Sequence, residues 1–239
     1  MTKPLHKAVI VLGFGPSDRP DAMTPPGPGG TAAVRRAVKE ALAAGMKELV
    51  FVTADSLTPV EAQFGDVGSG KAERVVIARQ FAAGNLAEAL CGVRHLLDEE
   101  PFMLLLPGDL AACPDEDVAG RLVASYRENG GNLVALTDDG VLKRDGSFAA
   151  IGACPGGCYL LQPAVLDALE DDLEGGLAGA LLTVAEAWPV TALPPRARAG
   201  GARLQPLLPS SERPTVRAPR PVAVAAARER GDWPGTAGL

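Results

Sequence analysis

Three short stretches of this chain carry residues suited to binding a phosphate group and a metal ion. Gly13-Phe14-Gly15 would let backbone N–H groups approach an anion, because glycine has no Cβ in the way. Arg19 follows, and its planar guanidinium is suited to binding phosphate. The alternative interpretation is a surface arginine with no role in binding. Asp109 comes just after the apolar run 104–106 and is the candidate Mg²⁺ ligand, with a turn or capping aspartate as the alternative. The sequence therefore predicts a site for an anionic, metal-dependent ligand.

Buried strands that alternate with helices are expected to position these residues. Apolar runs predict strands at 7–12, 48–53, 75–78, 102–106 and 132–137, and apolar residues at helical spacing predict helices at 32–44, 85–97, 117–129 and 164–173. Thr31 is the expected N-cap of the first helix. One or two further strands are expected within 149–162, around a Pro155-Gly156-Gly157 turn. This order predicts an α/β fold with a doubly wound, mostly parallel sheet in three layers, α/β/α.

The composition changes after Trp188. Residues 1–188 are predicted to form the α/β domain, whereas 189–239 are rich in Pro and Arg and show no period of either kind. We expect this second part to be an irregular tail that holds short extended pieces at most. A scaffold that binds a partner through this tail is one functional hypothesis.

Charge and hydropathy exclude several classes of partner. The net charge is -6, with 23 Lys+Arg against 29 Asp+Glu, which gives no field to attract nucleic acid or an anionic membrane. The apolar run near the N-terminus spans only 8–12, and no run reaches the roughly 18 apolar residues of a membrane span. The four cysteines have no paired CxxC spacing and are expected to be free thiols, with a metal or redox role as the alternative. We therefore expect a soluble, cytoplasmic protein.

The segments at the predicted strand ends also resemble a known family when they are taken in order. The strand at 7–10 with Gly13-Phe14-Gly15, the helix and strand at 40–53, Arg79-Gln80 with Gly84, the stretch 100–110 and the stretch 157–163 are together similar to bacterial UTP–glucose-1-phosphate uridylyltransferases. The resemblance covers residues 7 to 185 and implies a Rossmann-like nucleotidyltransferase fold. It also implies a nucleotide or a nucleotide sugar as the ligand.

In the family that the chain resembles, a sugar phosphate oxygen attacks the α-phosphorus of a nucleoside triphosphate and pyrophosphate leaves. The resemblance implies that Gly13, Phe14 and Gly15 contact the nucleotide and that Gln80 with Gly84 lies at the uracil. The Gln80 amide could read a base edge because it both donates and accepts hydrogen bonds; a solvent-facing glutamine is the alternative. Arg19 and Asp109 would then serve catalysis, with Mg²⁺ as the cofactor held by Asp109.

The chain also departs from the family pattern. The family's Gly-x-Gly-Thr-Arg continues here as Pro16-Ser17, no lysine occurs between Lys7 and Lys39, and no Glu-Lys-Pro triplet follows Thr137. The family's second metal-binding aspartate corresponds to Val184. These differences support the alternative hypothesis of a catalytically inactive binding or regulatory module, for which a homo-oligomer is left open.

Overall fold

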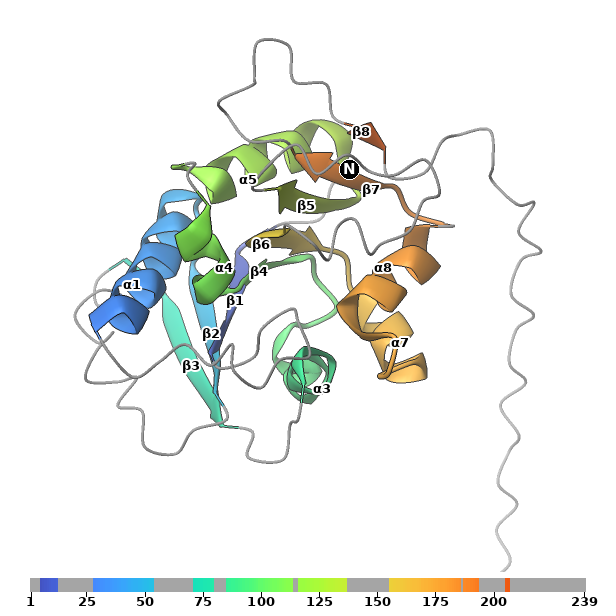
Figure 1. The fold of residues 1–239 in the computed structure, drawn as a ribbon, viewed down its shortest axis with the longest axis horizontal. Helices are drawn as coiled ribbons and strands as arrows, with labels where there is room; N and C mark the ends of the chain where they lie inside the picture. Colours follow the sequence, from blue (N-terminus) through green and yellow to red (C-terminus); the bar gives the residue numbers. More distant parts are fainter. Residues whose placement is uncertain are drawn as a thin grey trace, which may run out of the picture.

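The computed structural model describes residues 5–12, 28–53, 71–79, 85–113, 116–136, 155–185, 187–193 and 205–206. One sheet runs through them, with strand order β3-β2-β1-β4-β6-β5-β7-β8. Its strands are β1 (Lys7–Leu12), β2 (Glu48–Thr53), β3 (Arg74–Arg79), β4 (Phe102–Leu105), β5 (Asn132–Leu136), β6 (Pro155–Leu161), β7 (Val190–Leu193) and β8 (Gln205–Pro206). Strands β3, β2, β1 and β4 are mutually parallel, whereas β6 runs antiparallel to both of its neighbours (Figure 1).

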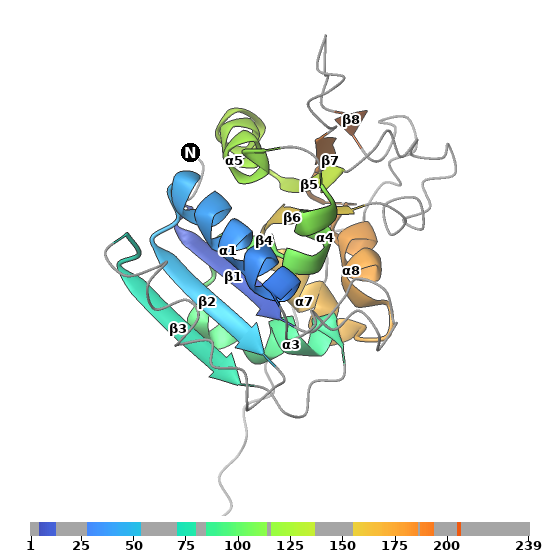
Figure 2. The ribbon, with the colours of Figure 1, turned by 60° about the vertical axis from the view of Figure 1, so that its left-hand side comes forward.

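Helices cover both faces of this sheet. On one face lie α1 (Pro28–Ala43), α4 (Pro107–Ala112) and α5 (Val118–Asn129). On the other lie α3 (Leu86–Gly92), the 3-10 turn η2 (Arg94–Leu96), α7 (Ala164–Asp171) and α8 (Gly176–Ala185). Figure 2 shows the two helical layers on either side of the strands. The predicted three-layer, doubly wound and mostly parallel arrangement is confirmed.

The central strands are buried on both faces, and their side chains alternate between two cores. In β1, Ala8 and Ile10 pack into the core beneath α1, α4 and α5, while Val9 and Val11 pack into the core beneath α3, α7 and α8. This alternation follows from the two-residue period of a strand. No helix in the described part of the chain combines the length and the apolar composition that crossing a membrane requires.

The main differences from the predicted helices are the start of α1 and the division of the segment 85–97. Helix α1 begins at Pro28, so Thr31 lies inside it and is not its N-cap. Proline is well placed in a first helical turn, where its missing N–H would have no partner in any case. The predicted helix at 85–97 is two pieces, α3 and η2, separated at Val93. Asn85, which the prediction placed inside this helix, is the N-cap of α3: its Oδ1 accepts a hydrogen bond from the Glu88 N–H at 2.9 Å.

The second half of the sheet contains the larger corrections. The predicted Pro155-Gly156-Gly157 turn is wrong, because these three residues begin strand β6. Proline is tolerated at a strand start, and Gly157 adopts φ 66° where the strand meets α4. Helix α8 has no counterpart among the predicted elements. The tail expected from residue 189 supplies β7, which pairs parallel to β5, so the sheet continues past the composition change at Trp188.

Candidate functional site at the carboxyl edge of the sheet

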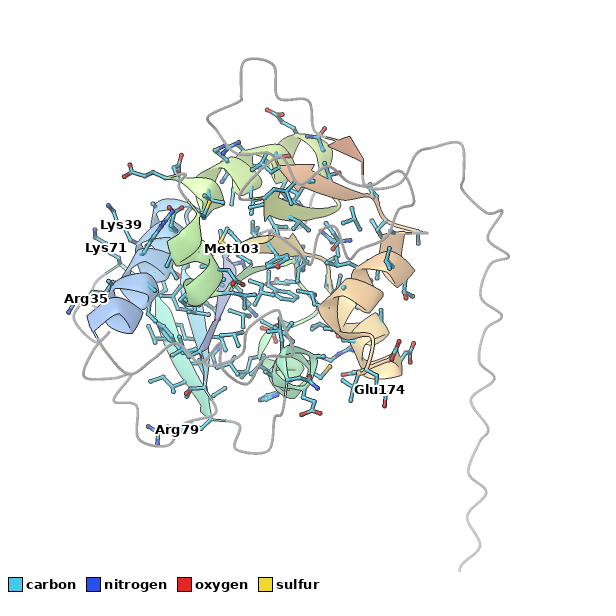
Figure 3. All side chains as sticks on the ribbon, viewed as in Figure 1. Arg35, Lys39, Lys71, Arg79, Met103 and Glu174 are labelled. Carbon is cyan, nitrogen blue, oxygen red and sulfur yellow. The ribbon has the colours of Figure 1, made fainter. Side chains whose placement is uncertain are left out.

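The carboxyl ends of the parallel strands lie together along one edge of the sheet. The register places Leu12 of β1 beside Thr53 of β2, and Thr53 beside Arg79 of β3. Neighbouring strands are about 4.8 Å apart, so Leu12 and Arg79 end within roughly 10 Å of each other. Figure 3 labels Arg79 at this edge. In open parallel sheets this edge is where ligands bind.

Most of the site residues predicted from the sequence lie beyond these strand ends. Gly13, Phe14, Gly15 and Arg19 follow β1, and Gln80 and Gly84 follow β3; all six lie outside the described residues. Their predicted roles are therefore untested. The strands from which they depart, β1 and β3, are separated by β2 alone and end at the same edge of the sheet, as the convergence of Gly13 and Gln80 requires.

Asp109 is the predicted site residue that the structure describes, and it occupies the first turn of α4. This short helix follows β4 directly, with Leu106 as its N-cap residue and Pro107 as its first residue. Oδ2 of Asp109 is buried and accepts no hydrogen bond within the described part of the chain. Burial raises the pKa of Asp109 to about 6. An ionised carboxylate in such a place is poorly solvated, so a cation or a hydrogen-bond donor would stabilise it.

Two residues of β6 complete the surroundings of Asp109. A Cβ added at Gly157 would lie 2.8 Å from Cβ of Asp109 and 2.4 Å from the backbone N of Leu110, so only glycine permits this approach. The Leu106 N–H donates to the Gly157 carbonyl at 2.7 Å. Tyr159 is buried, and its pKa is raised first by burial and then by the nearby Asp109 carboxylate. Strand β6 therefore fixes the position of the Asp109 turn.

Sequence reasoning assigned no role to Gly157 or Tyr159. Both belong to the stretch 157–163 that carried part of the resemblance, but the predicted turn placed Gly157 away from any helix. Their closeness to Asp109 depends on the antiparallel pairing of β6 with β4, in which Tyr159 lies opposite Leu104. The available signal was the single aromatic residue in the run Cys158-Tyr159-Leu160-Leu161.

Helix α1 holds the segment that follows Asp109. Nη1 of Arg36 donates to the Cys113 carbonyl, at the end of α4, over 2.9 Å. The buried Glu40 carboxylate then accepts hydrogen bonds from the N–H groups of Asp117 and Ala119, at 3.0 and 3.1 Å. These bonds satisfy donors at the start of α5 that have no partner within the helix. The Asp109 turn is thus held from β6 on one side and from α1 on the other.

The donor set around Asp109 partly fits a magnesium ion. Carboxylate oxygen is the ligand that Mg²⁺ prefers, and Mg²⁺ commonly takes one or two carboxylates and completes its shell with water and substrate phosphates. A buried carboxylate oxygen without a protein partner meets that description. Within the described ranges, however, no three His, Cys, Asp or Glu side chains gather as a metal site. Val184, which the resemblance sets at the position of the family's second aspartate, is buried in α8 and offers no ligand atom.

Comparison with known proteins adds a fold assignment. No protein-family model matches the chain, and no curated protein matches it in sequence. Among solved structures, it is similar to the UDP-glucose pyrophosphorylase from Acinetobacter baumannii, with 16% identity over 80% of this chain and 86% of that one, at a TM-score of 0.51. The UTP-bound UGPase from the same organism gives 15% identity over 81% and 87%, at 0.50. A UDP-glucose pyrophosphorylase complexed with UDP-glucose gives 17% identity over 77% and 88%, at 0.49.

The chain shares the arrangement of strands and helices seen in these solved structures. At this level of identity the likeness extends to the arrangement of strands and helices, and it assigns no substrate to the present chain. It does agree with the three-layer, Rossmann-like architecture predicted from the sequence.

Proposed function

We propose that this protein binds a nucleoside triphosphate at the carboxyl edge of its sheet and transfers the nucleotidyl group to a sugar phosphate, in the manner of the uridylyltransferases that it resembles. The observation that carries the proposal is Asp109, whose buried Oδ2 lacks a partner within the described residues and follows directly on a central strand. The resemblance at 7–185 and the shared fold support the same reaction class. UTP and glucose 1-phosphate are the first substrates to test.

The side chains of the protein take little direct part in the bond changes of this reaction. The sugar phosphate oxygen attacks the α-phosphorus in line, the bond to the β-phosphate oxygen breaks, and pyrophosphate leaves. Asp109 would hold Mg²⁺, which when bound neutralises charge on the triphosphate. Gly13 and Gly15 would donate backbone N–H groups to the phosphates, and Gln80 would orient the base. Catalysis then rests on positioning and charge neutralisation.

A second candidate function is nucleotide binding without transfer. Two observations favour it: Val184 stands where the family has its second metal-binding aspartate, and no second carboxylate joins Asp109 within the described ranges as part of a metal site. A single carboxylate is enough to bind a magnesium–nucleotide complex weakly, because the phosphates supply further oxygen ligands. Such a protein would act as a sensor or a regulatory module.

Magnesium-dependent release of pyrophosphate from UTP and glucose 1-phosphate separates the two candidates. Transfer predicts product formation that Asp109→Asn abolishes and Gln80→Ala weakens through KM. Binding alone predicts that UTP or UDP-glucose binds the folded protein without turnover. If the folded protein neither binds nor turns over these ligands or other nucleoside triphosphates, both candidate functions are excluded.

A further inference from the structure

The two outermost strands of the sheet differ in how open they are to a further strand. At one end, β8 has two residues and one of them is proline, and both features hinder further pairing. At the other end, β3 has six residues, and among the residues that the structure describes no strand pairs with its outer side. Figure 2 shows β3 as the outermost strand, beside β2. Strand β3 is therefore the place where the sheet can be extended.

The middle of β3 carries none of the residues that usually protect an outer strand. Residues 75–78 read Val-Val-Ile-Ala, without charge, proline or glycine, and the register of β3 with β2 is unbroken. Val75 is 48% exposed, and the next three side chains are only partly buried. Proteins usually protect such a strand with a central charge, a proline or a bulge. A strand that lacks these features is suited to pairing with another chain.

The outer side of β3 presents peptide groups that can form hydrogen bonds. The Arg74 N–H donates to the Lys47 carbonyl at 3.2 Å, so the peptide groups of Arg74 point toward β2. Successive residues of a strand direct these groups to opposite sides, so those of Val76 also face β2. The N–H and carbonyl groups of Val75 and Ile77 then point outward. These two residues supply the donors and acceptors for a further strand.

The side chains of β3 are complementary to those of a second copy in one antiparallel register. With Val76 on a two-fold axis, Val75 of one copy lies opposite Ile77 of the other. Glu73, the residue before the strand, then lies beside Arg79 of the other copy, and both side chains are exposed. An axis at Val75 would place Glu73 against Ile77. An axis at Ile77 would place Arg79 against Val75. Only the register around Val76 joins apolar to apolar residues and opposite charges to each other.

We propose that two copies of this protein form a two-fold dimer in which their β3 strands pair antiparallel around Val76 and join the two sheets into one. The same surface is used by both copies, so the contact between Glu73 and Arg79 occurs twice. Glu73 keeps its exposed pair with Lys47 of its own chain. One short strand from each copy makes a smaller contact than a standard interface of about 1,600 Å². We therefore expect a dissociation constant on the order of micromolar.

Charge reversal tests the contact between Glu73 and Arg79. Sedimentation of the full-length protein from about 1 to 200 μM brackets the expected dissociation constant. Glu73→Arg and Arg79→Glu each place like charges side by side twice per dimer, which should raise this constant roughly tenfold or more. The double variant restores opposite charges and should return it to within about threefold of the parent. Arg127→Glu, the same charge change at an exposed position on α5, is the matched control and should have no effect.

Oxidative cross-linking tests the register. A residue on the two-fold axis lies opposite its own copy, with Cβ atoms about 5 Å apart, which is close enough for a disulfide to form with small shifts. Val76→Cys should therefore give a covalent dimer when diamide oxidises the thiols. Val75→Cys and Ile77→Cys are the matched controls, because each lies opposite a different residue and should stay uncross-linked. The parent, which keeps the native cysteines, gives the background.

Several results would overturn the proposal. One is a parent protein that sediments as a monomer at every concentration. Another is a dimer that neither single charge reversal weakens, or that the double variant fails to restore, because the contact then lies elsewhere. Cross-linking through Val75→Cys or Ile77→Cys in place of Val76→Cys would contradict the register. Far-UV circular dichroism confirms that the compared proteins are folded.

Discussion

The two edges of the sheet differ in whether the protein supplies a partner for a buried charged side chain. At the amino edge, the ammonium of the buried Lys7 donates to the Leu96 carbonyl at 3.2 Å and pairs with Asp98, while His6 lies 3.4 Å from Glu100. At the carboxyl edge, the buried Oδ2 of Asp109 finds no partner in the described part of the chain.

The pKa shifts of two aspartates express this difference. The Lys7 ammonium lowers the pKa of Asp98, first through their hydrogen bond and then through its charge. Burial raises the pKa of Asp109 to about 6. A carboxylate matched by the protein stabilises the fold, whereas an unmatched buried one costs stability that a ligand can restore. The amino edge therefore contributes to the stability of the fold, whereas the carboxyl edge carries the unmatched carboxylate to which the proposed function gives a binding role.

The largest effect is expected where the fold holds the Asp109 turn. Gly157→Ala should lower the free energy of unfolding by about 3 to 5 kcal/mol, because the new Cβ overlaps backbone atoms of α4 and φ is positive. Gly45→Ala is the matched control: φ is 90° but no atom lies within 4 Å, so about 1 kcal/mol is expected. Urea denaturation measures both. Equal losses would show that β6 does not press on the Asp109 turn.

A smaller loss of stability is expected when the charged contacts of Lys7 at the amino edge are removed. Lys7→Met keeps the buried stem but removes the charged donor to the Leu96 carbonyl, which should cost about 2 kcal/mol in urea denaturation. The control is Lys47→Met, which removes an exposed pair with Glu73 and should leave stability unchanged. If Lys7→Met were neutral, the amino edge would not owe its stability to matched charges.

The smallest effect has the opposite sign and depends on pH. The folded pKa of Asp109, about 6, lies above its ordinary value of 3.8, so this group's contribution to stability is fully present below pH 3.8 and is lost as the pH rises through 6. Asp109→Asn removes that loss and should stabilise the protein by about 1 kcal/mol at pH 7.5, a figure reduced for partial exposure. The gain should fade as the pH approaches 4.

For Asp98→Asn, the change in stability should depend on pH in the opposite way. The lowered pKa of Asp98 means that its contribution is present above the unfolded pKa and is lost as the pH falls. Asp98→Asn should therefore weaken the protein at neutral pH, and its difference from the parent should shrink in acid. Denaturation curves at several pH values compare the two variants, and parallel behaviour would contradict the contrast between the edges.

The central strands were predictable because each is a continuous apolar run with clear limits. Strands β1 and β2 occupy the predicted residues 7–12 and 48–53, and β5 occupies 132–136 of the predicted 132–137, with residue 137 outside the described part of the chain. Helix α8 was missed because it is apolar on its outer side and rich in glycine, so it lacks the polar stripe that marks a surface helix. Strand β7 was missed because four residues are too few to show a period.

The candidate site was predictable only where it depends on local order along the chain. Asp109 could be selected because it follows a buried strand, and the structure places it at the carboxyl end of β4. Gly157 and Tyr159 could not be selected, since their relation to Asp109 arises from pairing between strands more than 40 residues apart. A Pro-Gly-Gly triplet predicts a turn on local grounds, and here the contact with α4 decides otherwise.

Calorimetric titration with UTP, in the presence and absence of Mg²⁺, tests the role of the carboxyl edge most directly. We expect the parent and Asp98→Asn to bind UTP more tightly with Mg²⁺ than without it, and Asp109→Asn to bind UTP equally weakly in both conditions. Equal magnesium dependence in Asp109→Asn and the parent would contradict the assignment of this edge as the metal–nucleotide site.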